Sequence, residues 1–138
     1  MNKLLSTSPI LPMGGLAVIR IIIGCFLIYH GWEVFDADKM REYASWDNFK
    51  NSSSGLFMVY MGKIAELLGG VMLAIGCFTR LACIIVIVTM SYIAFSLGHG
   101  KIWYEDQYPF LFVMLGFVFI FSGPGKWSVD NLLFNQKR

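Results

Sequence analysis

Two charged residues stand deep inside apolar runs of the sequence. Arg20 lies nine residues after the start of the run that begins at Leu11, and Glu66 lies twelve residues before the run ends at Phe78. A charge at the centre of a membrane helix costs roughly 2.5–3.5 kcal/mol, so such residues either neutralise one another or serve a function. They could fix helix packing as an ion pair, or they could bind an anionic or quinone-like ligand or relay protons. The sequence leaves these alternatives open.

Both charges lie on helix faces that carry glycine. At about 100° per residue, Arg20 shares its face with Gly24 and Gly31, and Glu66 shares its face with Gly69. Small residues let helix backbones approach closely in lipid, so these faces should point into a helix bundle. At about 1.5 Å per residue the two charges lie about 14 and 18 Å from the same end of the bundle. We therefore predict an Arg20–Glu66 ion pair inside the bundle.

A second group of polar residues gathers toward the opposite end of the predicted helices. Its members are His30, Glu33, Lys63, His99, Trp103 and Glu105. Two histidines beside carboxylates suit proton transfer or the mouth of a binding pocket. The chain has only two histidines and neither an H-x-x-H nor an H-E-x-x-H motif, so no metal site is predicted.

Composition indicates that the bilayer is the solvent of these helices. Of the 138 residues, 57% are hydrophobic and only 14% are charged, against roughly a quarter charged in a soluble domain. The apolar residues form long runs, which predict spans at about 11–35, 57–78, 81–98 and 105–122. Residues 36–56 mix charges with aromatic side chains and are predicted to be an interfacial loop, and residues 128–135 an amphipathic tail. The predicted fold is a single-domain, all-α membrane protein. It is a four-transmembrane-helix antiparallel bundle with a short C-terminal interfacial helix.

Charge gives a weak indication of orientation. An even number of spans puts both termini on one side, with five basic residues there against four on the other. Because basic residues favour the cytoplasm, both termini are predicted to be cytoplasmic. The net charge of +2 without a dense basic block excludes a nucleic-acid partner and leaves the lipid bilayer as the expected one.

Three stretches resemble one known family of membrane proteins. They are Arg20 with His30-Gly31, the run Glu66-Leu67-Leu68-Gly69-Gly70 with Gly76-x-x-Thr79-Arg80, and Gly123-Pro124-Gly125-Lys126-x-Ser128-x-Asp130. In this pattern the chain is similar to the DoxX family over nearly its whole length. It departs from the family at Val34, where many members carry lysine.

The resemblance implies a small protein of the bacterial inner membrane, related to the membrane subunit of thiosulfate:quinone oxidoreductase. The expected function is a quinone-linked or redox-complex-associated subunit with a polar cavity inside the bundle. If the chain takes part in catalysis, it would be as a membrane oxidoreductase subunit. The sequence carries no cofactor fingerprint, so quinone is the candidate cofactor, and a redox subunit or a second copy of the chain is the candidate partner. The alternative is a non-catalytic scaffold or assembly factor, and a small-solute or proton carrier is less well supported.

Overall fold

The computed structural model of the chain describes residues 12–134. The predicted start of the first span at residue 11 and the end of the predicted tail at residue 135 lie outside these residues. Lys3, Lys137 and Arg138, which entered the prediction of orientation, lie outside them as well. Within residues 12–134 the chain forms helices and turns and no strand, which confirms the all-α prediction.

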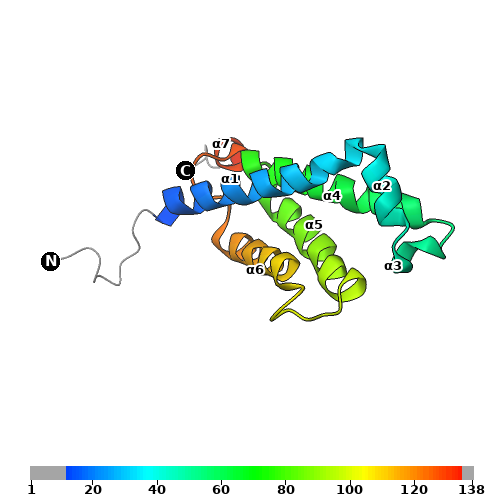
Figure 1. Ribbon diagram of the computed structural model, residues 1–138. Helices are drawn as coiled ribbons and strands as arrows, with labels where there is room; N and C mark the ends of the chain where they lie inside the picture. The colour runs from blue at the N-terminus through cyan, green and yellow to red at the C-terminus, as the bar shows by residue number, and fades with distance from the viewer. Residues whose placement is uncertain (1–11, 135–138) are drawn as a thin grey trace.

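The helices follow one another with short connections (Figure 1). In chain order they are α1 (Pro12–Gly31), the 3-10 helix η2 (Trp32–Phe35), α2 (Ala37–Ala44), α3 (Asp47–Lys50), α4 (Gly55–Ile75), α5 (Thr79–Tyr92), the π-helix η3 (Ile93–Leu97), α6 (Gln107–Ser122) and α7 (Val129–Phe134). Only three residues, 76–78, join α4 to α5.

Three stretches of helix are long and apolar enough to cross a membrane. They are Met13–Phe35, Gly55–Ile75 and Thr79–Leu97. The 16 residues of α6 are equally apolar but extend only about 24 Å, short of a hydrocarbon core of about 30 Å. Large apolar side chains remain exposed on the outward faces of these helices, among them Ile22, Phe26, Leu68 and Ile84. In water such a surface would drive association, whereas in a bilayer lipid tails cover it.

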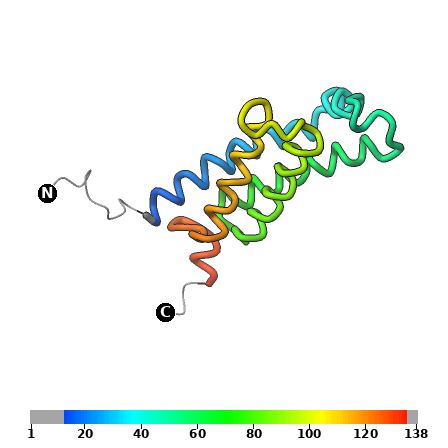
Figure 2. The backbone as a smooth tube through the Cα atoms, turned by 90° about the horizontal axis from the view of Figure 1, so that it is seen from below, coloured from blue at the N-terminus to red at the C-terminus, as the bar shows by residue number. Residues whose placement is uncertain are grey.

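One hydrophobic core joins the four apolar helices. Its buried members are Ile23 and Leu27 of α1, Leu73 of α4, Ala82, Cys83, Val86 and Met90 of α5, and Val113 and Phe119 of α6. Figure 2 shows α5 and α6 side by side. The chain after α6 returns to the start of α1, where the Lys126 N–H donates to the Met13 carbonyl oxygen at 3.0 Å. The two ends of the described chain therefore meet at one end of the molecule.

Glycine lets α1 and α4 approach backbone to backbone. Atoms of Ala74 and Gly70 lie so close to Gly24 that a Cβ there would meet them at 2.6–2.8 Å, and Gly31 lies equally close to Leu67. As the chain advances from Gly24 to Gly31, its contacts move back along α4 from Ala74 to Leu67, so the two helices run in opposite directions. This confirms that Gly24 and Gly31 face inward.

The segment 36–54 lies within the predicted interfacial loop of residues 36–56 and folds against the start of α4, which already begins at Gly55. Asp36 caps α2 by accepting hydrogen bonds from the backbone N–H groups of Asp38 and Lys39 at 3.1 Å. Met40 and Phe49 are buried against Val59 of α4 in a small core of their own. We call this segment the α2–α3 cap.

Candidate functional site

Arg20 is fully buried, and its guanidinium binds four backbone carbonyl oxygens. Its Nε donates to Pro124 at 2.9 Å, its Nη2 to Trp127 at 2.8 Å, and its Nη1 to Ala74 at 3.1 Å and to Leu73. Two of these oxygens belong to the last turn of α4, and two belong to the chain that follows α6. Arg20 thus joins α1, α4 and the C-terminal segment.

The end of α4 explains why an arginine is needed there. The last carbonyls of a helix lack partners within the helix and carry the negative end of its dipole. Gly76 ends α4 in the left-handed conformation at φ 68°, where Cys77 and Gly76 donate to the carbonyls of Met72 and Leu73. Arg20 satisfies the remaining carbonyl of Ala74 and adds positive charge at the favourable end.

The predicted Arg20–Glu66 ion pair is wrong. Within residues 12–134 every hydrogen bond of the Arg20 guanidinium goes to a backbone carbonyl, and the ion pair of Glu66 is with Lys63. The cause is the stagger of the two helices. Gly24 lies against Ala74, so Arg20, one turn earlier in α1, faces the last turn of α4 and the chain beyond it. Glu66 lies next to Leu67, which packs against Gly31 at the other end of α1.

The segment 123–130 closes this end of the molecule. Asp130 accepts hydrogen bonds from the backbone N–H groups of Phe78 at 2.6 Å and Thr79 at 2.8 Å, so it caps α5. Phe78 has a φ of 47°, a conformation unusual for a residue with a side chain, and this bond holds it there. Ser128 caps α7 by accepting from the N–H group of Asn131 at 3.1 Å.

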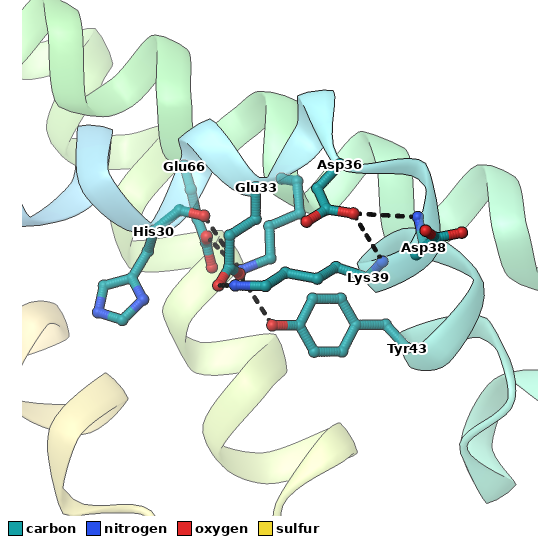
Figure 3. Close-up of polar contacts among 8 residues, drawn as sticks. His30, Glu33, Asp36, Asp38, Lys39, Tyr43 and Glu66 are labelled. Carbon is teal, nitrogen blue, oxygen red and sulfur yellow. Dashed lines mark hydrogen bonds and ion pairs between the residues drawn. The ribbon is translucent and has the colours of Figure 1, made fainter.

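A second charged group of the apolar helices, the half-buried Lys63, lies between the carboxylates of Glu33 and Glu66, both of which are labelled in Figure 3. Its Nζ is 3.0 Å from Glu33 Oε2 and 3.0 Å from Glu66 Oε2. It also donates to the carbonyl oxygen of His30 at 3.4 Å, so the backbone of His30, not its imidazole, takes part. The residue Glu66 is only 5% exposed. An ammonium group placed between two carboxylates neutralises charges that would otherwise be costly to bury.

The α2–α3 cap completes this group on the surface side. Lys39 Nζ lies 2.8 Å from Glu33 Oε1, and the Tyr43 hydroxyl donates to Glu33 Oε2 at 2.8 Å. Burial and the hydrogen bond to Glu33 raise the pKa of Tyr43 to about 12, so this hydroxyl stays protonated and remains a donor. We call Glu33, Lys39, Tyr43, Lys63 and Glu66 the Lys63 cluster.

The sequence reasoning missed Lys39 and Tyr43. Both lie in the α2–α3 cap. This segment folds back onto α4 because Met40 and Phe49 pack against Val59, which lies further along the chain. One feature of the sequence indicates that they act together. Lys39 and Tyr43 are four residues apart in a helix that Asp36 caps, and this spacing places both side chains on the same helix face.

The predicted convergence of His99, Trp103 and Glu105 with this cluster is not found among the contacts of residues 12–134. His99 Nδ1 lies 3.6 Å from Glu105 Oε2, which also pairs with Lys101 at 3.3 Å. Trp103 is 89% exposed. The carboxylate of Asp106 accepts from the N–H groups of His99 and Lys101 and folds this loop on itself. The loop therefore forms a separate polar group after η3.

A cavity of about 220 Å³ borders the Lys63 cluster. Tyr43, Trp46 and Phe49 of the α2–α3 cap form one side. The other sides are formed by Met58, Val59, Gly62, Lys63 and Glu66 of α4 and by Thr89, Tyr92, Ile93 and Leu97 of α5 and η3. The lining is mainly apolar and aromatic, with the Lys63 ammonium and Glu66 carboxylate as charged groups. Such a cavity suits a flat apolar ligand that carries hydrogen-bond acceptors.

Comparison with known proteins gives the family. The family model described as DoxX matches residues 15–99, well over half of the chain. A Haemophilus influenzae protein described as uncharacterized is 30% identical over 128 residues, which cover 88% of this chain and 92% of that protein. No solved structure matches the chain. Because this family model matches more than half of the chain, and three stretches of helix are long and apolar enough to cross a membrane, the chain belongs to the DoxX family of multi-pass membrane proteins.

Proposed function

We propose that the chain is a quinone-binding subunit of a membrane redox system. The observation that carries this proposal is the aromatic cavity beside the Lys63 cluster. A quinone presents a flat ring that packs on aromatic side chains, and its two carbonyl oxygens accept hydrogen bonds. Lys63 is a charged donor at the cavity wall. Met58, Val59 and Leu97 offer an apolar lining for the hydrocarbon part of the ligand.

The electrons must come from outside the chain. The sequence carries no haem-attachment, flavin or iron–sulfur fingerprint, so a partner subunit would reduce or oxidise the bound quinone. The contribution of this chain would be to hold the quinone and to exchange protons with it.

The binding test uses Trp46 as a reporter, because it lines the cavity. In a protein whose other three tryptophans are changed to phenylalanine, a short-chain quinone should quench Trp46 fluorescence in a saturable manner. Gly62→Leu should weaken quinone binding, because Gly62 lines the cavity and the leucine side chain would occupy it. A Cβ added at Gly62 has no atom within 4 Å, so the substitution should not disturb the fold. We expect at least a tenfold loss of affinity.

The matched control is Gly15→Leu. Gly15 also has open space around it but lies in α1, away from the cavity lining. The Gly15→Leu variant should bind the quinone with the affinity of the parent protein. Quenching that does not saturate, or that is equal in Gly62→Leu and the parent, would contradict quinone binding in this cavity.

We further propose four membrane crossings in an antiparallel bundle of the inner membrane, with both termini in the cytoplasm. The short helix α6 would be the fourth crossing. Exposed aromatic side chains flank it, with Trp103, Tyr104 and Tyr108 before or at its start and Trp127 after it, and such residues favour the two membrane–water interfaces. Local thinning of the bilayer can accommodate a helix of this length at modest cost.

Reporter fusions test this topology. Alkaline phosphatase, which is active only outside the cytoplasm, should be inactive after residue 138 and active when inserted after Asn51 in the α2–α3 cap. Green fluorescent protein after residue 138 should fluoresce. An active phosphatase at the C-terminus would mean three or five crossings or the reverse orientation.

A second candidate is a membrane scaffold without a ligand. The observation that favours it is Arg20, whose guanidinium is fully occupied by carbonyls of the same chain and needs no other partner. A scaffold predicts that Gly62→Leu leaves cell phenotype and partner association unchanged. Loss of function in Gly62→Leu at normal protein level would favour the quinone proposal.

A further inference from the structure

The Lys63 cluster forms a continuous series of ionisable groups from the protein surface to the cavity. Side-chain exposure falls from 45% at Lys39 to 18% at Glu33, 16% at Lys63 and 6% at Glu66. Consecutive members lie 2.8, 3.0 and 3.0 Å apart. Lys63 and Glu66 line the cavity, whereas Glu33 and Lys39 are not among its lining residues in the described chain.

The position of Glu33 is unusual for a residue that only neutralises charge. Glu66 already provides Lys63 with a carboxylate at 3.0 Å. Glu33 adds a second one, which the Tyr43 hydroxyl and the Lys39 ammonium hold in place (Figure 3). It links Lys63 to the more exposed Lys39. Ionisable residues inside membrane spans commonly mark proton pathways.

We infer that Glu33 is the relay residue that carries protons from the membrane surface to Lys63, which delivers them to the ligand in the cavity. This inference rests on the proposed quinone binding. The redox partner subunit of the proposed function, a one- or two-electron carrier in its reduced form, supplies two electrons to the quinone and is itself oxidised, and each of the two quinone oxygens gains one proton to give the quinol. Lys63 gives up an ammonium proton to a reduced oxygen and becomes a neutral amine. Glu33 then takes a proton from water at the surface and passes it to that amine, and the cycle repeats for the second proton.

The groups that face this path come from four helical elements, α1, η2, α4 and α5, and from the α2–α3 cap. His30 and Glu33 belong to α1 and η2, Lys39 and Tyr43 to α2, and Lys63 and Glu66 to α4. Tyr92 of α5 lines the same cavity. Glu33→Gln removes one ionisable group of this path without removing a residue of the cavity lining.

The test measures quinone binding and quinol formation separately. Binding is followed by Trp46 quenching, and quinol formation is followed by voltammetry of the membrane-bound protein, where the electrode supplies both electrons. Glu33→Gln should bind quinone with the parent affinity but form quinol about a hundredfold more slowly, within the range for loss of a positioned acid or base. Glu33→Asp, which keeps a carboxylate, should recover part of the rate. Small weak acids such as formate or azide should partly restore Glu33→Gln, which a purely structural role would not allow.

Asp38→Asn is the matched control. Asp38 is an exposed carboxylate of α2 paired with Arg41, outside the Lys63 cluster, so its loss changes the net charge equally. It should leave both affinity and rate unchanged. Quinol formation at the parent rate in Glu33→Gln, or slow formation that weak acids do not restore, would overturn the relay while quinone binding stands. An absence of saturable binding in the parent protein would overturn the proposed function, and the relay with it.

Discussion

Replacing Arg20 by leucine should destabilise the protein by about 3–5 kcal/mol, the cost of removing one partner of a buried, charged interaction. The four carbonyl oxygens of Leu73, Ala74, Pro124 and Trp127 lose their donor together. A hydrogen bond to a charged group contributes about 1.5–3 kcal/mol, and a carbonyl left buried without a partner costs about 1–3 kcal/mol. Unfolding of the purified protein in mixed micelles, followed by circular dichroism against the mole fraction of denaturing detergent, measures this change.

Two further variants separate the hydrogen bonds from the charge. Arg20→Lys keeps the charge but has a single donor atom in place of three nitrogens, so it should recover only part of the stability. Arg80→Leu removes an exposed arginine that makes no polar contact within residues 12–134, and it should change stability by less than about 0.5 kcal/mol. Equal stability of Arg20→Leu and Arg80→Leu would contradict the capping role.

Replacing Gly24 by alanine should destabilise the protein by about 1–3 kcal/mol, although alanine normally favours a helix. The added Cβ would lie 2.6 Å from the backbone N of Ala74 and 2.8 Å from the carbonyl oxygen of Gly70. Both are backbone atoms of α4, which cannot yield without separating the two helices. The same unfolding titration measures the loss, and Gly24→Leu should produce a larger one.

Gly15→Ala is the control on the same helix. A Cβ at Gly15 has no atom within 4 Å, so this change should be neutral or should stabilise α1 by about 0.5–1 kcal/mol through helix propensity. A loss in Gly15→Ala equal to that in Gly24→Ala would mean that the effect arises in the helix itself and not in its contact with α4.

The buried Arg20 and the Lys63 cluster have different consequences for function. Arg20 is occupied entirely by the protein backbone, so its substitution should reduce folded protein and leave the remaining folded molecules able to bind ligand. The Lys63 cluster borders a cavity, so substitutions there should change binding or proton transfer at normal protein level. Measuring protein amount and quinone affinity together distinguishes the two sites.

The sequence predicted the features that depend on local chemistry. Long apolar runs identified the membrane helices, because only such runs are compatible with lipid. The predicted spans 57–78 and 81–98 leave only two residues between them, which indicated a tight turn there, and the structure makes that turn at Gly76 in the left-handed conformation. The isolated charges Arg20 and Glu66 were recognised as unusual for the same reason, namely the cost of a charge among apolar residues.

Only the tertiary structure decided which partners those charges have. The sequence gives depths along single helices, and Arg20 and Glu66 have similar depths when each is counted from its own helix end. The close approach of Gly24 to Ala74 staggers α1 past the end of α4, which brings Arg20 to the last carbonyls of α4 and to Pro124. The packing of Met40 and Phe49 on Val59 brings Tyr43 and Lys39 to Glu33. Both results depend on contacts between residues far apart in the chain, which the spacing of residues along one helix does not contain.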